Sequence, residues 1–263
     1  QIAMSADGSL VAVAGESAED SMPSLQVWQL GMENVWQPYG RAITGFGRAV
    51  ALSADGGTLA ASTMDVGQVA VWYFGSGRWQ DMGGPFTSAS ATDQGYGTSL
   101  ALSDDGSILA VGVLISNDQQ AMGAAHLYQN VEGSWGEMLM GSPLSPAPLT
   151  ARSSCEPVGV SVALSGDGLT VAVGATGANA VRVYDFDATT GWDERGAEIV
   201  ATTANECIGY TVGVSGDGSV VSMGVSSTLG VKVYYWAPSS MVWTAVSTEG
   251  ESLLLGSATS ANG

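Results

Sequence analysis

The single histidine, His126, is the side chain best suited to move protons near neutral pH. Because it stands alone, a metal site built on several histidines is excluded within these residues. A Ser-His-Asp triad would have to use His126, but the sequence has no Gly-x-Ser-x-Gly elbow to present the serine. We therefore expect a structural position for His126, at an edge or beside the core, and predict no catalytic residue.

Acidic side chains offer two other kinds of chemistry. Glycoside hydrolysis needs two inward carboxylates, yet the segments expected at the centre of the fold hold no Asp or Glu outside their turns. The densest acidic cluster contains Asp185 and Asp187, with Asp193 and Glu194 nearby. A solvated rim is the simpler interpretation, so Asp185 and Asp187 are weak metal candidates only. We predict no cofactor, with calcium as the alternative.

Cys155 and Cys207 are the only cysteines, and they lie ten and eight residues before Ser165 and Ser215. They therefore occupy matching linkers of neighbouring sequence repeats. Matching positions one repeat apart can come close, so we predict a disulfide between Cys155 and Cys207, with two unpaired thiols as the alternative. A disulfide favours an extracellular setting.

The motif Ser-x-Asp-Gly occurs five times and divides the chain into repeats. Its aspartates lie 48, 50, 62 and 50 residues apart, which is the spacing of propeller blades. Ser and Asp can bond neighbouring backbone amides, and Gly adopts the left-handed conformation that closes a hairpin. A lone aspartate cannot supply the six to eight oxygens that calcium prefers. We therefore assign a turn role to Asp7, Asp55, Asp105, Asp167 and Asp217.

The residue pattern of each repeat predicts four short strands. The first strand precedes the turn, the second follows it, the third ends in an aromatic residue, and the fourth carries one tryptophan. The first two strands use small residues, and the bulky rings come later, as expected for blades that are crowded near an axis and splay outward. We assign the packing between blades to Trp36, Trp79, Trp135, Trp192 and Trp243.

This size gradient predicts an all-β fold, a β-propeller of five four-stranded blades that forms a single domain over residues 1–263. The expected blades are 1–45, 46–94, 95–156, 157–207 and 208–250, with 251–263 as a tail or linker. The five blades either close into a ring or belong to a larger one. Because residue 1 falls on a first strand and the tail resembles a linker between blades, we expect a chain cut from something longer.

The charge balance excludes several partners. The chain of 263 residues carries 25 acidic side chains against seven Lys and Arg, a net charge of −18. A phosphate-binding surface needs a basic stripe, so nucleic acid and anionic membranes are poor partners. No apolar run approaches the 18 residues of a spanning helix, so we expect no membrane insertion within these residues.

The longest linker, residues 136–158, is rich in Pro, Ser and Thr, which indicates an exposed loop. Its candidates for O-linked sugar are Ser142, Ser145, Thr150, Ser153 and Ser154. Aromatic residues outside the regular pattern are the candidates for a ligand-binding surface: Tyr39, Tyr73, Phe74, Phe86, Tyr235 and Trp236.

A hydrophobic-Gly pair precedes the first strand in four repeats, at Phe46-Gly47, Tyr96-Gly97, Val158-Gly159 and Ile208-Gly209. With second strands that end as in Val173 to Thr176, these pairs resemble the FG-GAP repeat of integrin α-chain propellers and many secreted or surface proteins, although the final Pro is absent. The turn is also similar to that of a WD-type blade, without its Gly-His and Trp-Asp pairs. In FG-GAP proteins this turn is often a calcium loop, here cut to one Asp.

Together these features predict a non-enzymatic, extracellular or cell-surface propeller. It would serve as a structural or adhesion module that contacts protein or glycan, or as a self-assembling protomer of an extracellular filament. A carbohydrate-binding lectin is the first alternative, and a glycoside hydrolase is the second.

Overall fold

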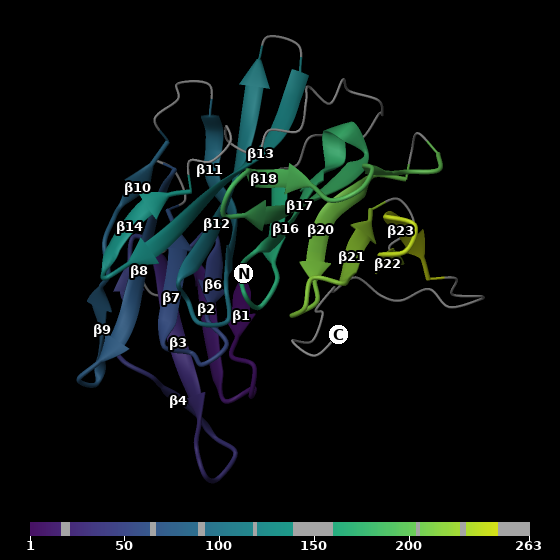
Figure 1. Cartoon of the computed structure of the whole chain (residues 1–263). Helices are drawn as coiled ribbons and strands as arrows, with labels where there is room; N and C mark the ends of the chain where they lie inside the picture. The colour runs from purple at the N-terminus through teal and green to yellow at the C-terminus, as the bar shows by residue number, and fades with distance from the viewer. Residues whose placement is uncertain are drawn as a thin grey trace.

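The computed structural model describes residues 1–16, 22–63, 67–88, 93–117, 120–138, 160–203, 206–226 and 230–246. Within these residues the fold is all-β, apart from a single 3-10 turn, η1 (Thr176–Ala178). Five antiparallel sheets of four or five strands follow one another in chain order (Figure 1). In this part of the chain no helix has the length and apolarity needed to cross a membrane.

The strands fall into five groups along the chain. The first sheet contains β1 (Ile2–Met4), β2 (Leu10–Glu16), β3 (Pro23–Leu30), β4 (Trp36–Pro38) and β5 (Ile43–Thr44). The second contains β6 (Val50–Leu52), β7 (Thr58–Ser62), β8 (Gln68–Gly75), β9 (Arg78–Asp81) and β10 (Phe86–Thr87). The third contains β11 (Asp93–Leu102), β12 (Ile108–Asn117), β13 (Gln120–Val131) and β14 (Ser134–Glu137).

The fourth sheet contains β15 (Val160–Leu164), β16 (Thr170–Ala175), β17 (Ala180–Asp187), β18 (Gly191–Glu194) and β19 (Ile199–Val200). The fifth contains β20 (Ile208–Val214), β21 (Val220–Val225), β22 (Gly230–Ala237) and β23 (Val242–Ala245). Three sheets thus have five strands, where the sequence predicts four. The extra strands are the two-residue β5, β10 and β19, which pair with the stretch of the third strand that the short fourth strand leaves open.

The Ser-x-Asp-Gly turns join the first two strands of every sheet. In the fourth sheet the Ser165 hydroxyl donates to Asp167 Oδ1 at 2.6 Å and accepts from the Thr170 amide at 2.9 Å. Asp167 Oδ1 also accepts from the Leu169 amide at 2.9 Å, and Gly168 has a φ of +72°. The side chains thus satisfy amides that a tight hairpin leaves without a backbone partner.

The same turns connect neighbouring sheets. The amide after each turn serine donates to the carbonyl at the same place in the next sheet, from Ala6 to Ala54 at 2.9 Å and from Ala54 to Asp104 at 3.0 Å. The line continues from Asp104 to Gly166 and from Gly166 to Gly216, each at 2.8 Å. Consecutive sheets therefore share one register at their turn ends.

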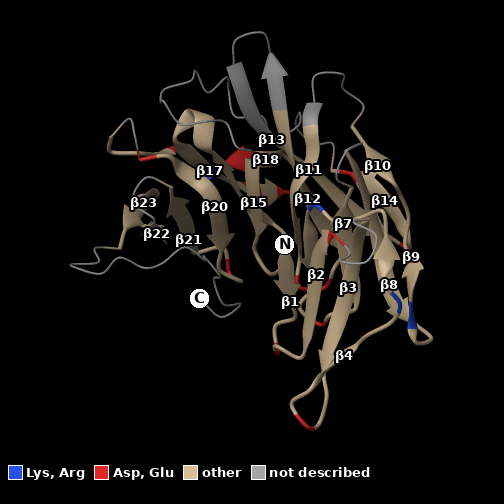
Figure 2. Ribbon diagram, turned by 180° about the vertical axis from the view of Figure 1, so that it is seen from behind, with Lys and Arg blue, Asp and Glu red and all other residues tan. Residues whose placement is uncertain are grey.

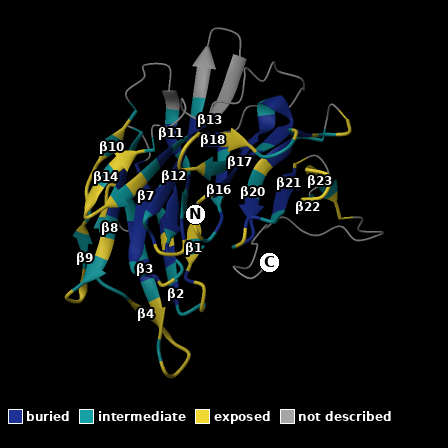
Figure 3. Ribbon diagram, viewed as in Figure 1, coloured by how far each residue is buried: buried dark blue, intermediate teal, exposed yellow. Residues whose placement is uncertain are grey.

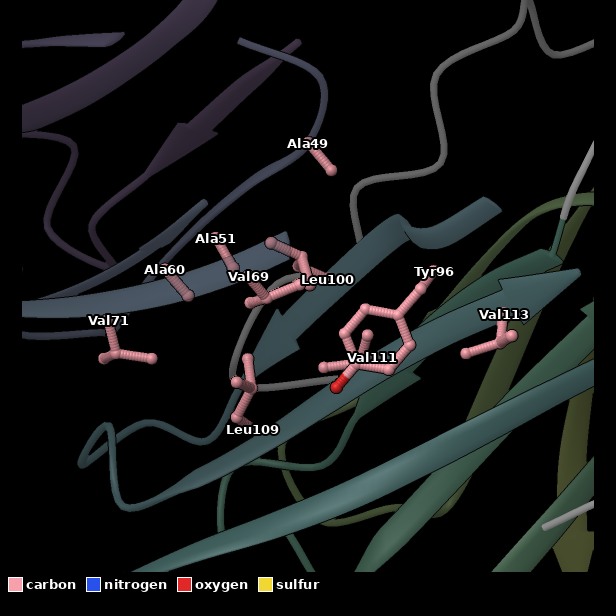
Figure 4. Packing of buried hydrophobic residues seen from close by; sticks show 10 residues of the cluster. All are labelled: Ala49, Ala51, Ala60, Val69, Val71, Tyr96, Leu100, Leu109, Val111 and Val113. Carbon is pink, nitrogen blue, oxygen red and sulfur yellow. The ribbon is translucent and has the colours of Figure 1, made fainter. Parts of the chain in front are cut away.

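Separate apolar clusters fill the spaces between consecutive sheets. Figure 4 shows the cluster between the second and third sheets, in which small residues such as Ala60 and Val71 face Leu109, Val111 and Tyr96. β7 and β16 are buried along their whole length, whereas β4, β9, β14 and β23 are half-buried or exposed (Figure 3). Small residues predominate in these clusters, but the predicted size gradient has an exception: Tyr96, a fully buried ring, lies on β11, the first strand of its sheet.

The tryptophans of the fourth strands bridge neighbouring sheets. The indole N–H of Trp79 donates to the Tyr39 carbonyl at 3.1 Å, and that of Trp243 donates to the Arg195 carbonyl at 2.8 Å. In both pairs the acceptor belongs to the preceding sheet. These two rings therefore cover apolar surface and also fix the distance to the preceding sheet, whereas the indole N–H groups of Trp135 and Trp192 are buried without a hydrogen-bond partner in the part of the chain that the structure describes.

Candidate functional site

One position on the third strand carries a basic side chain in each of the last three sheets. It is occupied by His126 on β13, Arg182 on β17 and Lys232 on β22. The register makes the three equivalent, because each lies opposite the fifth residue after its turn glycine, namely Val111, Val173 and Met223. In the first two sheets the same position holds Gln26 and Ala70, so the basic side chain is a feature of the last three sheets only.

A glutamate accepts from each of these basic groups. His126 Nδ1 lies 2.8 Å from Glu137 Oε1, and the other pairs are Arg182 Nε to Glu198 Oε1 at 3.1 Å and Lys232 Nζ to Glu206 Oε2 at 2.7 Å. Burial opposes ionisation of Glu206, but hydrogen bonds from Lys232 and Thr202 outweigh it and lower its pKa. The sister sites are therefore ion pairs.

His126 differs from its sister residues because an imidazole can give up its proton near neutral pH, whereas guanidinium and ammonium groups stay charged. Glu137 accepts at Nδ1, which places the lone pair of a neutral ring on Nε2. The His126 ring lies 5.8 Å from the Tyr96 ring and 6.4 Å from the Tyr128 ring, centroid to centroid. The two tyrosine hydroxyls are 2.7 Å apart and share a hydrogen bond. Of these four residues, Tyr96 is buried, His126 and Tyr128 are half-buried, and Glu137 is exposed.

Sequence reasoning missed Glu137 as the partner of His126. The missing signal is the tight turn at Glu132 and Gly133, whose φ angles are +53° and +85°. This turn pairs Val131 with Ser134 and so brings Tyr128 opposite Glu137. With the register known, Glu137 is the diagonal neighbour of His126 on the same face.

Asp185 and Asp187, the weak metal candidates, already have protein partners. Asp185 accepts from the Thr170 hydroxyl at 2.8 Å and faces Arg195 Nε at 3.3 Å. Asp187 caps a turn through the Thr189 hydroxyl and amide, and these hydrogen bonds lower its pKa. Among the described residues, no three His, Cys, Asp or Glu side chains gather in a way that could hold a metal ion.

The turn aspartates lie at one end of the sheets, each bonded to its own turn. Hydrogen bonds from the Ser5 hydroxyl and the Ser9 amide lower the pKa of Asp7 to about 2. The Ser215 hydroxyl and the Ser219 amide do the same for Asp217, also to about 2. These carboxylates are ionised turn residues that stabilise the hairpin.

The irregular aromatic residues differ in their availability. Tyr39 stacks on Phe74 with 3.9 Å between ring centroids, and Phe86 packs on Tyr128 at 5.0 Å. Trp236 lies under the Arg195 guanidinium at 5.0 Å. These rings are engaged in packing between sheets, whereas Tyr73 and Tyr235 are exposed. Lysine and arginine are sparse over the ribbon (Figure 2).

Several predicted residues lie outside the described part of the chain. They are Cys155 and the candidates for O-linked sugar, Ser142, Ser145, Thr150, Ser153 and Ser154. Cys207 is described, is half-buried, and is not a free thiol. Its pairing with Cys155 stays a prediction.

No protein-family model and no curated protein matches this sequence. Among solved structures, it is similar to a Bacteroides fragilis protein provisionally called a 6-phosphogluconolactonase, at a TM-score of 0.60 and 13% identity over 93% of this chain and 82% of that one. A periplasmic gluconolactonase of Pseudomonas aeruginosa follows at 0.51 and 14%, over 94% and 84%. A β-propeller domain from Myceliophteria thermophila matches at 0.54 and 11%, over 93% and 69%. The all-β fold therefore has β-propellers among its structural neighbours.

These neighbours correct the predicted function. The non-enzymatic adhesion or filament module was inferred from the propeller fold and from a lack of catalytic groups. Two of the three neighbours carry the names of lactone-hydrolysing enzymes, so the step from this fold to a non-enzymatic role is wrong. The second premise, that the chain has no catalytic residue, stays a prediction; the structure adds only that His126 has a bonded glutamate, Glu137.

Proposed function

We propose that this chain belongs to a β-propeller enzyme that hydrolyses a small lactone, with His126 and Glu137 as its proton-transfer pair. One observation carries the proposal: an imidazole stands where the fourth and fifth sheets have permanent cations. The names of two structural neighbours support the substrate class, an internal ester of a sugar acid.

The chemistry follows from the geometry of the pair. The oxygen of a water molecule attacks the lactone carbonyl carbon while His126 Nε2 takes a proton from that water. Glu137, which accepts from Nδ1 at 2.8 Å, stabilises the imidazolium that forms. The tetrahedral adduct then breaks its ring C–O bond, and the proton passes from His126 to the departing ring oxygen. Lactone and water thus become one hydroxy acid.

The finer architecture is part of the same proposal. The five sheets are five blades of a propeller whose ring is larger than this chain, and the FG-GAP resemblance describes their repeat. The glycines of two hydrophobic-Gly pairs support this assignment, because a Cβ at Gly97 would meet Ser62 Cβ at 2.7 Å and one at Gly47 would meet the Gly15 carbonyl at 2.7 Å. The extracellular setting rests on the predicted disulfide.

The test exchanges His126 for the residue that the repeat uses elsewhere. The variant His126→Arg keeps a cation beside Glu137 but cannot accept a proton at neutral pH. Hydrolysis of glucono-δ-lactone, and of its 6-phosphate, is followed by acid release after subtraction of the spontaneous rate. We expect the variant to lose about 100-fold or more in kcat/KM with its unfolding free energy retained. The matched control, Lys232→Arg, should leave kcat/KM unchanged.

Two results would contradict the assignment. One is a folded His126→Arg protein with the activity of the parent chain, which would make the histidine an ordinary ion-pair residue. The other is the absence of lactone hydrolysis by the parent chain on both substrates. Glu137→Gln separates positioning from packing, because it keeps the shape of the side chain but removes the charge that stabilises the imidazolium.

A further inference from the structure

The first sheet exposes a position that every other sheet buries. Val13, the fifth residue after its turn glycine, is 40% exposed. At the same place in the other four sheets the exposed fraction is at most 2%, for Ala61, Val111, Val173 and Met223. The repeat thus uses this position for contact with a preceding sheet, and the first sheet shows it to solvent.

Neighbouring apolar residues share this exposed face. The register places Ile2 opposite Val13 and Met4 opposite Val11, so all four project to one side of the sheet. Ile2 is 75% exposed and Met4 is 63% exposed. The other side, which includes Ala12, packs in the cluster shared with the second sheet. Large apolar side chains of this kind are rarely left together in water without a partner.

The turn of the first sheet repeats this asymmetry. A Cβ built on Gly56, Gly106, Gly168 or Gly218 would come within 3 Å of a side chain in the preceding sheet, namely Leu10, Thr58, Ile108 or Thr170. At Gly8 it would meet no atom within 4 Å. Within the described residues, moreover, the Ala6 carbonyl accepts no hydrogen bond, whereas its counterparts Ala54, Asp104, Gly166 and Gly216 each accept one.

The outer strand agrees with the inner ones. The four tryptophans of the later sheets are buried or half-buried, and two of them, Trp79 and Trp243, donate their indole N–H groups to carbonyls of the preceding sheet. Trp36, the equivalent tryptophan of the first sheet, is 42% exposed. The inner strands, the turn and the outer strand of the first sheet thus agree. Each exposes the surface that contacts the preceding sheet elsewhere in the repeat.

We infer that this first-sheet face, made of Ile2, Met4, Val11, Val13, Gly8 and Trp36, docks a further sheet of the same repeat, supplied by polypeptide outside residues 1–263. Each open feature fits what such a sheet carries. Its turn amide donates to the Ala6 carbonyl, its second strand covers Gly8 and Val13, and the carbonyl after its fourth strand accepts from Trp36. The inference rests on the propeller architecture proposed above and is independent of the chemistry assigned to His126.

The length of the neighbours agrees with this occupant. The chain spans 82% and 84% of the two proteins named as lactonases while nearly all of it is matched, so each holds additional chain. A further sheet also reproduces a contact that the structure makes four times between its own sheets. A sheet of this repeat would cover the turn, the strand face and the indole at once.

The experiment supplies a sheet of known sequence. A second copy of residues 157–207, which carries its own Ser-x-Asp-Gly turn, is fused ahead of residue 1. Acrylamide quenching of Trp36 is taken as the difference between each protein and its Trp36→Phe variant. We expect the Stern–Volmer constant of Trp36 to fall several-fold in the fusion. A fused Gly-Ser segment of equal length, and the fusion carrying Val13→Asp, are the controls, and neither should protect Trp36.

A second measurement uses the unfused chain. Met4→Ser should leave its unfolding midpoint unchanged, because the side chain has no sheet to lose. An unprotected Trp36 in a folded fusion overturns the inference, as does a destabilised Met4→Ser chain. Light scattering on the unfused chain should give a monomer; a dimer that Val13→Asp dissociates would make a second copy the occupant and overturn it as well. None of these readings changes with lactone hydrolysis.

Discussion

Shortening the same valine in two sheets measures how much one sheet stabilises the next. Val173 on β16 and Val13 on β2 occupy equivalent positions, but Val173 is 2% exposed and Val13 is 40% exposed. Valine to alanine removes two carbon groups, worth about 1.6 kcal/mol of transfer free energy at about 0.8 kcal/mol for each. At Val173 the closed packing adds a cavity cost, so we expect a total of about 2–3 kcal/mol. At Val13 we expect about 1 kcal/mol, because the side chain keeps part of its contact with water and no sealed cavity forms.

Urea unfolding followed by tryptophan fluorescence gives both values. The midpoint should move to lower urea for Val173→Ala with little change in the slope m, and by less than half as much for Val13→Ala. A reduced m value would mean that the sheets unfold separately, in which case the two midpoints are read from local probes. Equal losses in the two variants would refute the reasoning, because they would show that Val13 is as well covered as Val173.

Two further predictions concern the turns and the cysteines. The pKa values of Asp7 and Asp217 lie at about 2 in the folded chain, against 3.8 for a free carboxyl, so their stabilisation is complete above about pH 4 and is lost as the pH falls toward 2. Ser215→Ala removes the largest cause of the low pKa of Asp217, so acid unfolding followed by circular dichroism should begin at higher pH. Reduction of the purified chain should add the mass of two hydrogens if Cys155 and Cys207 are bonded, and the Cys207→Ser variant should show no such change.

The sequence predicted the fold best at positions where one physical requirement selects the residue type in every repeat. Ser165, Asp167 and Gly168 predict a turn because two side chains bond amides and a glycine tolerates positive φ. The fifth strand of three sheets was not predictable in this way. At Ile43–Thr44 and Phe86–Thr87 a strand is only two residues long, so it shows no alternation and depends on the backbone that its neighbour leaves open.

The candidate site was harder to predict because it depends on register. Nothing in the separate positions of His126 and Glu137 links them until the turn at Glu132 and Gly133 fixes which residues face each other. The absence of a known triad was therefore weak grounds for excluding catalysis. A motif search compares this chain with other proteins. The informative comparison is between equivalent positions in different sheets of the same chain, where His126 replaces Arg182 and Lys232.

In a repeat protein each position has internal controls, so a departure from the sister residues carries more meaning than the residue type alone. A histidine beside a glutamate is common, but a histidine where Arg182 and Lys232 form ion pairs marks a change from a fixed to a titratable charge. An exposed valine is equally ordinary, but an exposed Val13 where four sister positions are buried marks a missing neighbour. The two departures are independent, since one concerns chemistry within the third sheet and the other concerns the outer face of the first. Grafting tests this logic directly: moving the imidazole to the fourth sheet, as the double variant His126→Arg with Arg182→His, should give no lactone hydrolysis, because that site lacks the paired hydroxyls of Tyr96 and Tyr128.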